Sequence, residues 1–276
     1  MKKHLSTVLI VLMVLAGLGL LLYPSVSNYI NSKHQARVLT DYGNIVSSMD
    51  DAGKEEMFQR AVEYNEKLYS HPELFYRPDP ADNYNDILNV TGTGVMGYID
   101  IEKIGVQLPI YHGVAKEVLQ IGAGHLEGTS LPTGGINTHC VLSGHRGLPS
   151  SKLFTDLDEM EIGDRFVITV LDRQMMYEVD QIKTVLPDES DDLLIVEGKD
   201  YCTLVTCTPY GINTHRLLVR GHRVEMPEDY VAVYVPNEAI VVDPILTVAF
   251  TAVPLFILIT GSYYTVTLIR KRKERK

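Results

Sequence analysis

Thr203-Leu204-Val205-Thr206-Cys207 is a run of β-branched and apolar residues that ends on a cysteine. The segment 208–214 that follows contains proline, glycine and asparagine, which are typical of a loop. A second β-like run begins at Arg216. Two such runs around a short loop predict a β-hairpin, and this hairpin brings Arg216 back beside Cys207.

A cysteine beside an arginine is suited to acyl transfer if a base is also present. A thiol is only slightly ionised at neutral pH, so a nucleophilic cysteine needs a neighbouring base. We expect His145 to be that base, because it follows the strand-like run Thr138–Ser143 and lies between two glycines. Arg216 stays charged and is suited to stabilise an oxyanion. Residue types alone leave these roles open, because a lone cysteine is more often a small buried hydrophobic residue.

The other two cysteines are interpreted as core residues. Cys140 and Cys202 lie inside apolar runs, whereas Cys207 is followed at once by loop residues. An odd number of cysteines without repeated spacing predicts no disulfide framework, although one bridge between Cys140 and Cys202 remains open. No CxxC or HxxxH spacing suggests a metal site, and no cofactor is expected.

Two uncharged apolar segments, Leu5–Tyr23 and Pro244–Ile269, are each long enough to cross a bilayer core of about 30 Å. Basic residues lie before the first segment and in the tail 270–276 after the second. The positive-inside tendency therefore predicts that both termini are cytoplasmic and that the intervening domain is outside. The formal net charge of −10 argues against a nucleic-acid partner.

The region between these segments changes from a helical to a β pattern. From residue 28 to 69 apolar residues recur every three or four positions, which predicts two helices separated by Asp51-Ala52-Gly53. From Met96 onward short β runs predict a barrel or a sandwich. The predicted strands are Tyr98–Ile101, Leu108–Tyr111, Thr138–Ser143, Arg165–Val170, Met175–Val185, Cys202–Cys207 and Arg216–Glu225.

The Thr-Leu-Val-Thr-Cys motif, followed by Arg216 and preceded by His145 in Gly144-His145-Arg146-Gly147, resembles the signature of the sortases, the cysteine transpeptidases of Gram-positive cell surfaces. The resemblance covers roughly Gly94 to Glu225. It implies a mainly β fold, an eight-stranded β-barrel, with N-terminal helices. It also implies that Cys207, His145 and Arg216 are the catalytic residues.

The layout with two anchors further resembles the class C sortases, which assemble pili and carry a lid with an Asp-Pro-aromatic motif. Here Asp79-Pro80 fits that motif, but Ala81 replaces the aromatic residue. The resemblance implies that Asp79 pairs with Arg216. The ring over the cysteine would come from one of three nearby aromatic residues, Phe75, Tyr76 or Tyr84. A passive linker is the alternative interpretation of this segment.

The predicted parts of the chain follow from these features. They are a transmembrane anchor or signal (1–27), an extracellular helical region (28–70), a lid loop (71–93), the sortase barrel (94–226), a linker (227–243), a transmembrane helix (244–269) and a cytoplasmic basic tail (270–276). The expected location is the cell membrane of a Gram-positive bacterium, with the catalytic domain extracellular.

The reaction implied by the resemblance is transpeptidation. Cys207 would cleave an LPxTG-like sorting signal between Thr and Gly, and a lysine of a neighbouring pilin would release the acyl group as an isopeptide. Attachment of surface proteins to peptidoglycan is the alternative enzyme function. The segment Leu131-Pro132-Thr133-Gly134-Gly135 also raises the hypothesis of a wall-anchored surface protein, but it lies far from the C-terminal apolar segment, which argues against this.

Overall fold

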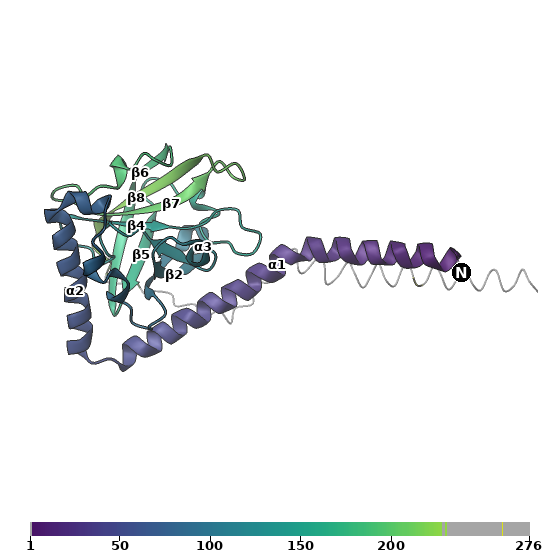
Figure 1. The fold of residues 1–276 in the computed structure, drawn as a ribbon, viewed down its shortest axis with the longest axis horizontal. Helices are drawn as coiled ribbons and strands as arrows, with labels where there is room; N and C mark the ends of the chain where they lie inside the picture. Colours follow the sequence, from purple (N-terminus) through teal and green to yellow (C-terminus); the bar gives the residue numbers. More distant parts are fainter. Residues whose placement is uncertain (1, 228–229, 231–260, 262–276) are drawn as a thin grey trace, which may run out of the picture.

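The computed structural model describes residues 2–227, 230 and 261, and for residues 2–12, 14 and 15 it gives only the helical path. Its centre is a closed barrel with the strand order β1-β2-β3-β4-β7-β8-β6-β5 (Figure 1). The strands are β1 (Val95–Ile101), β2 (Val106–His112), β3 (Ala123–His125), β4 (Thr138–Ser143), β5 (Arg165–Val170), β6 (Arg173–Val185), β7 (Asp200–Thr208) and β8 (His215–Val224).

The barrel interior is filled by alternate residues of the strands. Ile99, Leu142 and Leu204 are all fully buried, as expected where apolar residues recur with a period of two. The seven predicted strands are confirmed, and the mainly β barrel with N-terminal helices is confirmed with them. The eighth strand, β3, was not predicted, because its three residues Ala-Gly-His are too short to show an alternating pattern.

Two long helices precede the barrel, α1 (Lys2–Ser48) and α2 (Asp51–Ser70). Figure 1 shows that α1 extends far beyond the barrel, whereas α2 lies along its side. The predicted helix break is displaced, because Asp51-Ala52-Gly53 forms the first turn of α2 instead of a linker. The cause is a helix cap: the side chain of Asp50 accepts a hydrogen bond from the Gly53 N–H at 3.1 Å.

Shorter helical elements connect the strands. They are the α-helix α3 (Lys116–Leu119) and the 3₁₀ turns η1 (Pro72–Phe75), η2 (Pro80–Asp82), η3 (Tyr84–Asp86), η4 (Glu102–Ile104), η5 (Leu157–Glu159) and η6 (Asp191–Leu193). Three of these turns, η1 to η3, lie in the segment predicted to be a lid. The segment is therefore a series of tight turns, as its proline content favours.

Buried polar side chains attach the two helices to the barrel. The Tyr42 hydroxyl of α1 donates to the Met96 carbonyl at 3.1 Å and accepts from the Leu171 N–H at 2.7 Å. In α2, the Asn65 amide donates to the Leu131 carbonyl at 3.1 Å and accepts from the Leu131 N–H at 2.7 Å. Each side chain satisfies backbone groups that would otherwise be buried without partners, so the helices are integral to the domain.

The structure describes the first predicted membrane segment but, apart from one residue, not the second. The N-terminal segment Leu5–Tyr23 falls within α1. No helix in the described part of the chain combines the length and the apolar character needed to cross a membrane. Apart from Gly261, the predicted C-terminal segment 244–269 lies outside the described residues, as does the basic tail 270–276.

A buried histidine on β4 predicts loss of stability in acid. His139 is 1% exposed, and its ring nitrogens contact the Leu194 carbonyl at 2.8 Å and the Thr203 hydroxyl at 2.7 Å. Burial lowers the pKa of His139 to about 4, from 6.5. The unfolded chain therefore binds the proton more readily, and stability is lost as the pH falls below about 6.5.

We expect the free energy of unfolding to fall by about 3 kcal/mol between pH 7 and pH 4 through this histidine. Urea unfolding at several pH values measures the effect. His139→Gln should show a correspondingly shallower pH dependence, whereas the exposed His71→Gln should keep the full slope. Equal slopes for His139→Gln and the unsubstituted protein would contradict this assignment.

Candidate active site

The predicted hairpin places Cys207 and Arg216 side by side. β7 and β8 are antiparallel, and Cys207 is directly opposite Arg216 in their register. Directly opposed residues project on the same face of a sheet, with β-carbons about 5 Å apart. Cys207 is half-buried, while its neighbour Thr206 on the opposite face is fully buried. The cysteine is thus held on a rigid strand with its thiol on the same face as a guanidinium.

His145 reaches the same end of the barrel through the pairing of β4 with β7. The two strands are parallel, and the last pair in their register is Ser143 with Val205. Gly144 prolongs the contact, because its N–H donates to the Val205 carbonyl at 3.0 Å. His145 therefore leaves β4 at the level at which Cys207 occurs on β7. The structure brings the predicted nucleophile, base and arginine to one edge of the barrel.

Both threonines of the Thr-Leu-Val-Thr-Cys motif have a structural role in this arrangement. The Thr206 hydroxyl donates to the Gly144 carbonyl at 2.8 Å and so fixes the backbone next to His145. On the opposite face of β7, the Thr203 hydroxyl contacts His139 at 2.7 Å. These partners were not predicted. The spacing of the two threonines was the available signal, but their partners on β4 are far away in the sequence.

The electrostatic environment of His145 keeps its ring neutral. Burial lowers the pKa of the imidazole below its usual 6.5, and the positive charge of Lys116 lowers it further. A neutral imidazole at neutral pH is able to accept a proton from a thiol or an amine. His145 is therefore in the form that its predicted role as a base requires.

The side chain of Arg216 is held by the chain's own backbone. Its Nη1 donates to the His215 carbonyl at 3.1 Å and to the Asn213 carbonyl at 3.4 Å. Within the part of the chain that the structure describes, no carboxylate forms an ion pair with Arg216. Its charge is therefore not neutralised by a described partner and remains able to attract an oxyanion or a substrate carbonyl.

Asp79 does not have the partner that was predicted for it. Its carboxylate accepts from Lys67 of α2 at 3.0 Å and from the Ala81 N–H at 2.9 Å, and Asp82 accepts from the same lysine at 2.5 Å. The expected ion pair between Asp79 and Arg216 is therefore not formed. Lys67 supplies a cation much closer to this segment, and both acidic side chains converge on it.

Tyr84 is also a structural residue and not a ring over the thiol. It is 4% exposed, and its hydroxyl lies 2.8 Å from Nδ1 of His125 and accepts from the Gly113 N–H at 3.1 Å. Its ring packs against Tyr64, His112 and His125. Pro80 begins the exposed turn η2. Residues 79–84 thus join α2 to β2 and β3.

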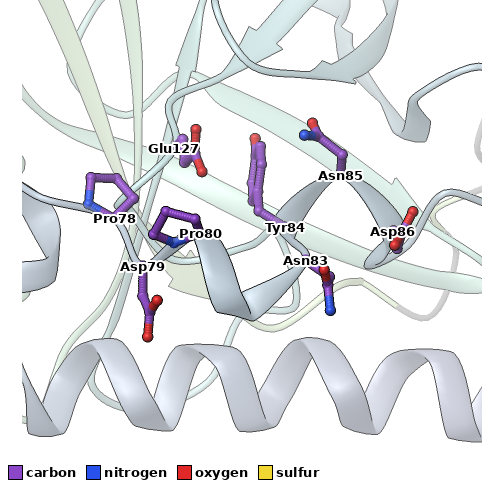
Figure 2. Close-up of a pocket in the computed structure, with 8 residues that line it drawn as sticks. All are labelled: Pro78, Asp79, Pro80, Asn83, Tyr84, Asn85, Asp86 and Glu127. Atoms are coloured by element: carbon purple, nitrogen blue, oxygen red, sulfur yellow. The ribbon is translucent and has the colours of Figure 1, made fainter.

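A pocket of about 500 Å³ opens along this segment. Figure 2 shows Asp79 turned toward the helix beneath it, while Tyr84 and Glu127 lie on the barrel side. The lining residues are Pro78, Asp79, Pro80, Asn83, Tyr84, Asn85, Asp86 and Glu127. None of the three predicted catalytic residues lines this pocket, so it is separate from the reaction site.

These contacts predict that Asp79 does not control access to Cys207. We expect Asp79→Ala and Lys67→Gln to leave the rate of Cys207 labelling by a methanethiosulfonate reagent within about twofold of the unsubstituted protein, because exposed ion pairs contribute little and this one does not touch the thiol. Intact-mass analysis over time measures the rate, and Lys54→Gln on α2 is the matched control. If Cys207 were labelled tenfold faster in Asp79→Ala than in the unsubstituted protein, the hypothesis that Asp79 belongs to a lid over the thiol would be supported instead.

The remaining cysteines have the positions predicted for them. Cys140 and Cys202 are 2% and 0% exposed, face each other in the register of β4 and β7, and are free thiols. Burial raises the pKa of the Cys202 thiol well above its usual range, so it is a poor nucleophile. Among the described residues, no group of His, Cys, Asp and Glu side chains is arranged to hold a metal ion.

The segment that mimics a sorting signal is part of the fold. Leu131 is fully buried and Thr133 is 8% exposed. Asn65 of α2 donates to the Leu131 carbonyl and, at 2.8 Å, to the Thr133 hydroxyl. A segment held in this way is not accessible as a cleavage site, which agrees with the sequence-based argument against a wall-anchored substrate.

Comparisons with known proteins are consistent with this geometry. A family model described as Sortase domain matches residues 99–224, which contain all three predicted catalytic residues. Sortase D of Bacillus subtilis is 30% identical over 149 residues, covering 53% of this chain and 72% of the relative. The region matched by the family model lies within the barrel.

Solved structures show the same similarity. Sortase C1 of Streptococcus agalactiae is 50% identical with a TM-score of 0.65, and the match covers 69% of this chain and all of that chain. Sortase C of Streptococcus pneumoniae, whose structure was described as informative on catalysis and pilin substrate specificity, is 44% identical with a TM-score of 0.61. That match covers 69% of this chain and 97% of the other.

Proposed function

Because the chain belongs to the sortase family, we propose that it is a membrane-anchored transpeptidase that joins pilin subunits through lysine isopeptide bonds. The observation that carries the proposal is the position of Cys207 opposite Arg216, with His145 leaving the adjacent strand at the same level. The similarity to structures of sortase C proteins supports pilin as the substrate class.

The first half-reaction forms an acyl-enzyme. The thiolate of Cys207 attacks the threonine carbonyl carbon of an LPxTG-like signal, and a C–S bond forms. Arg216 stabilises the oxyanion of the tetrahedral intermediate. The Thr–Gly C–N bond then breaks, and His145, which holds the thiol proton, gives it to the leaving glycine amine. The product is a thioester on Cys207.

The second half-reaction transfers the acyl group to an amine. The neutral ε-amine of a lysine on a neighbouring pilin attacks the thioester carbonyl, and His145 accepts the proton that the amine loses. The C–S bond breaks, an isopeptide bond forms, and the proton on His145 returns to the Cys207 sulfur. Each proton passes through one imidazole, so a single histidine serves both half-reactions.

The proposal includes attachment to the cell membrane of a Gram-positive bacterium, with the catalytic domain extracellular and both termini cytoplasmic. It is supported by the uncharged segments Leu5–Tyr23 and Pro244–Ile269 and by their basic flanks. Such attachment would hold the enzyme beside substrates that are themselves at the membrane.

Attachment of surface proteins to peptidoglycan is the second candidate function. The observation that favours it is the pairing of Asp79 with Lys67 in place of Arg216, which removes the lid contact implied by class C enzymes. Both functions share the thioester on Cys207 and differ only in the amine that releases it.

One competition experiment separates the two functions. The full-length protein in detergent is mixed with an LPxTG peptide, a lysine-containing pilin domain and a peptidoglycan stem-peptide amine, and the products are identified by mass spectrometry. We expect an isopeptide between threonine and the pilin lysine as the main product. Exclusive transfer to the stem-peptide amine would overturn the pilin assignment, and absence of cleavage would overturn both.

A further inference from the structure

Arg146, the residue after His145, connects the loop that follows β4 to β7, the strand that contains Cys207. Its side chain is 9% exposed and forms an ion pair with Asp158. Its Nη1 donates to the Thr208 hydroxyl at 3.5 Å, and its guanidinium lies 5.8 Å from the centre of the Tyr210 ring. Thr208 follows Cys207 directly along the chain, and Tyr210 is two residues further on. The arginine thus contacts the segment that carries the nucleophile.

The residues on both sides of His145 contact β7. On the N-terminal side, Gly144 is bound to β7 through its N–H to Val205 and through its carbonyl to Thr206. On the C-terminal side, the guanidinium of Arg146 reaches Thr208. The residues on both sides of the histidine are therefore fixed to the strand that ends on the cysteine.

The buried side chain of Arg146 lowers the stability of the fold. Nε of Arg146 is buried and has no hydrogen-bond partner among the described residues. An unsatisfied buried donor on a charged group is destabilising, and a partly paired arginine contributes less to stability than an apolar side chain of similar size. The presence of such a group beside the predicted catalytic histidine is better explained by positioning than by stability.

We propose that Arg146 is a positioning residue that holds the imidazole of His145 within reach of the Cys207 thiol. This inference rests on the proposed function, since it assigns the alignment of its base. The described side-chain contacts of Arg146 are to Asp158, Thr208 and Tyr210 and do not include the Cys207 thiol. We therefore expect its removal to affect the alignment of the two reacting groups more than substrate binding.

The expected effect on catalysis follows from the sensitivity of proton transfer to geometry. A displacement of about 1 Å lowers a reaction rate by about 100-fold. We therefore expect Arg146→Gln to lower kcat for transpeptidation by about 10- to 100-fold with KM changed less than about twofold. Arg146→Lys keeps the charge but not the planar fork, so it should recover only part of the activity.

The matched control is Arg165→Gln. Arg165 also forms a side-chain ion pair, to Glu178 at 2.8 Å, but between β5 and β6, which are not neighbours of β4 or β7. Asp158→Asn is a second variant, which weakens the ion pair between Asp158 and Arg146 without removing the arginine. It provides the test if Arg146→Gln does not fold, as judged by circular dichroism.

The experiment compares the pH dependence of Cys207 alkylation by iodoacetamide in the full-length protein. Alkylation needs no sorting signal, so it remains informative even if the proposed substrate is wrong. We expect the profiles of Arg146→Gln and Asp158→Asn to move toward that of His145→Gln, and that of Arg165→Gln to match the unsubstituted protein. The inference would be overturned if the profiles of Arg146→Gln and Asp158→Asn both coincided with that of the unsubstituted protein. It would also be overturned if Arg165→Gln lost as much kcat as Arg146→Gln.

Discussion

Replacing Cys207 with alanine is expected to abolish transpeptidation, with a loss of at least about a thousandfold in kcat/KM. The reason is that no thioester forms without this thiol, since the other two cysteines are buried inside the barrel. Release of the glycine-containing fragment from an LPxTG peptide measures the rate. The fold should be retained, because Cys207 is half-buried at a strand end and alanine leaves no core cavity.

The control for this variant is Cys202→Ala, which removes a thiol from the adjacent core. It should remain an active transpeptidase, although it will be less stable because it leaves a small cavity. Pilin polymer formed by Cys207→Ala in cells that lack other sortases would show that the nucleophile lies elsewhere.

His145→Gln is expected to lower kcat by about 100- to 10,000-fold, the usual contribution of a general acid and base. Glutamine retains hydrogen-bonding capacity and much of the volume but does not exchange protons. The loss should be concentrated in kcat, because the imidazole is required for bond breaking and not for recognition. Steady-state kinetics with an LPxTG peptide and an amine acceptor measure both constants.

A second histidine provides the control for this variant. His215→Gln changes a histidine next to Arg216 that has no place in the proposed proton transfers. It should retain kcat within about threefold, because its ring contacts Thr214 and the carbonyl that holds Arg216 belongs to the backbone, which the substitution leaves in place. If the two variants lose the same activity, the assignment of His145 as the base is wrong.

The strand hairpin of the site could be predicted because its determinants are local. Thr203–Cys207 alternates between the two faces of a strand, and the residues of 208–214 favour a loop, so the position of Arg216 beside Cys207 follows from adjacent sequence. His145 is different. Its position beside Cys207 depends on two parallel strands that are distant in sequence, so the sequence indicates it only through the strand-like run and glycines around His145 and through the resemblance to sortases.

The contacts that differ from the predictions are tertiary contacts. The partner of Asp79 is decided by the position of Lys67 on α2, and no local pattern specifies how that helix packs against the segment. Tyr84 was considered as a ring over the thiol, but its hydroxyl finds a buried partner in His125. The contacts of Arg146 were not predicted for the same reason, since its partners Thr208 and Asp158 come from the end of β7 and from η5.

The most direct test of the central claim is to trap the acyl-enzyme. The full-length protein is mixed with an LPxTG peptide without an amine acceptor, quenched in acid, digested and mapped by mass spectrometry. We expect one thioester, which carries the peptide up to its threonine and lies on Cys207. An acyl group on Cys140 or Cys202, or cleavage of the peptide without any thioester, would contradict it.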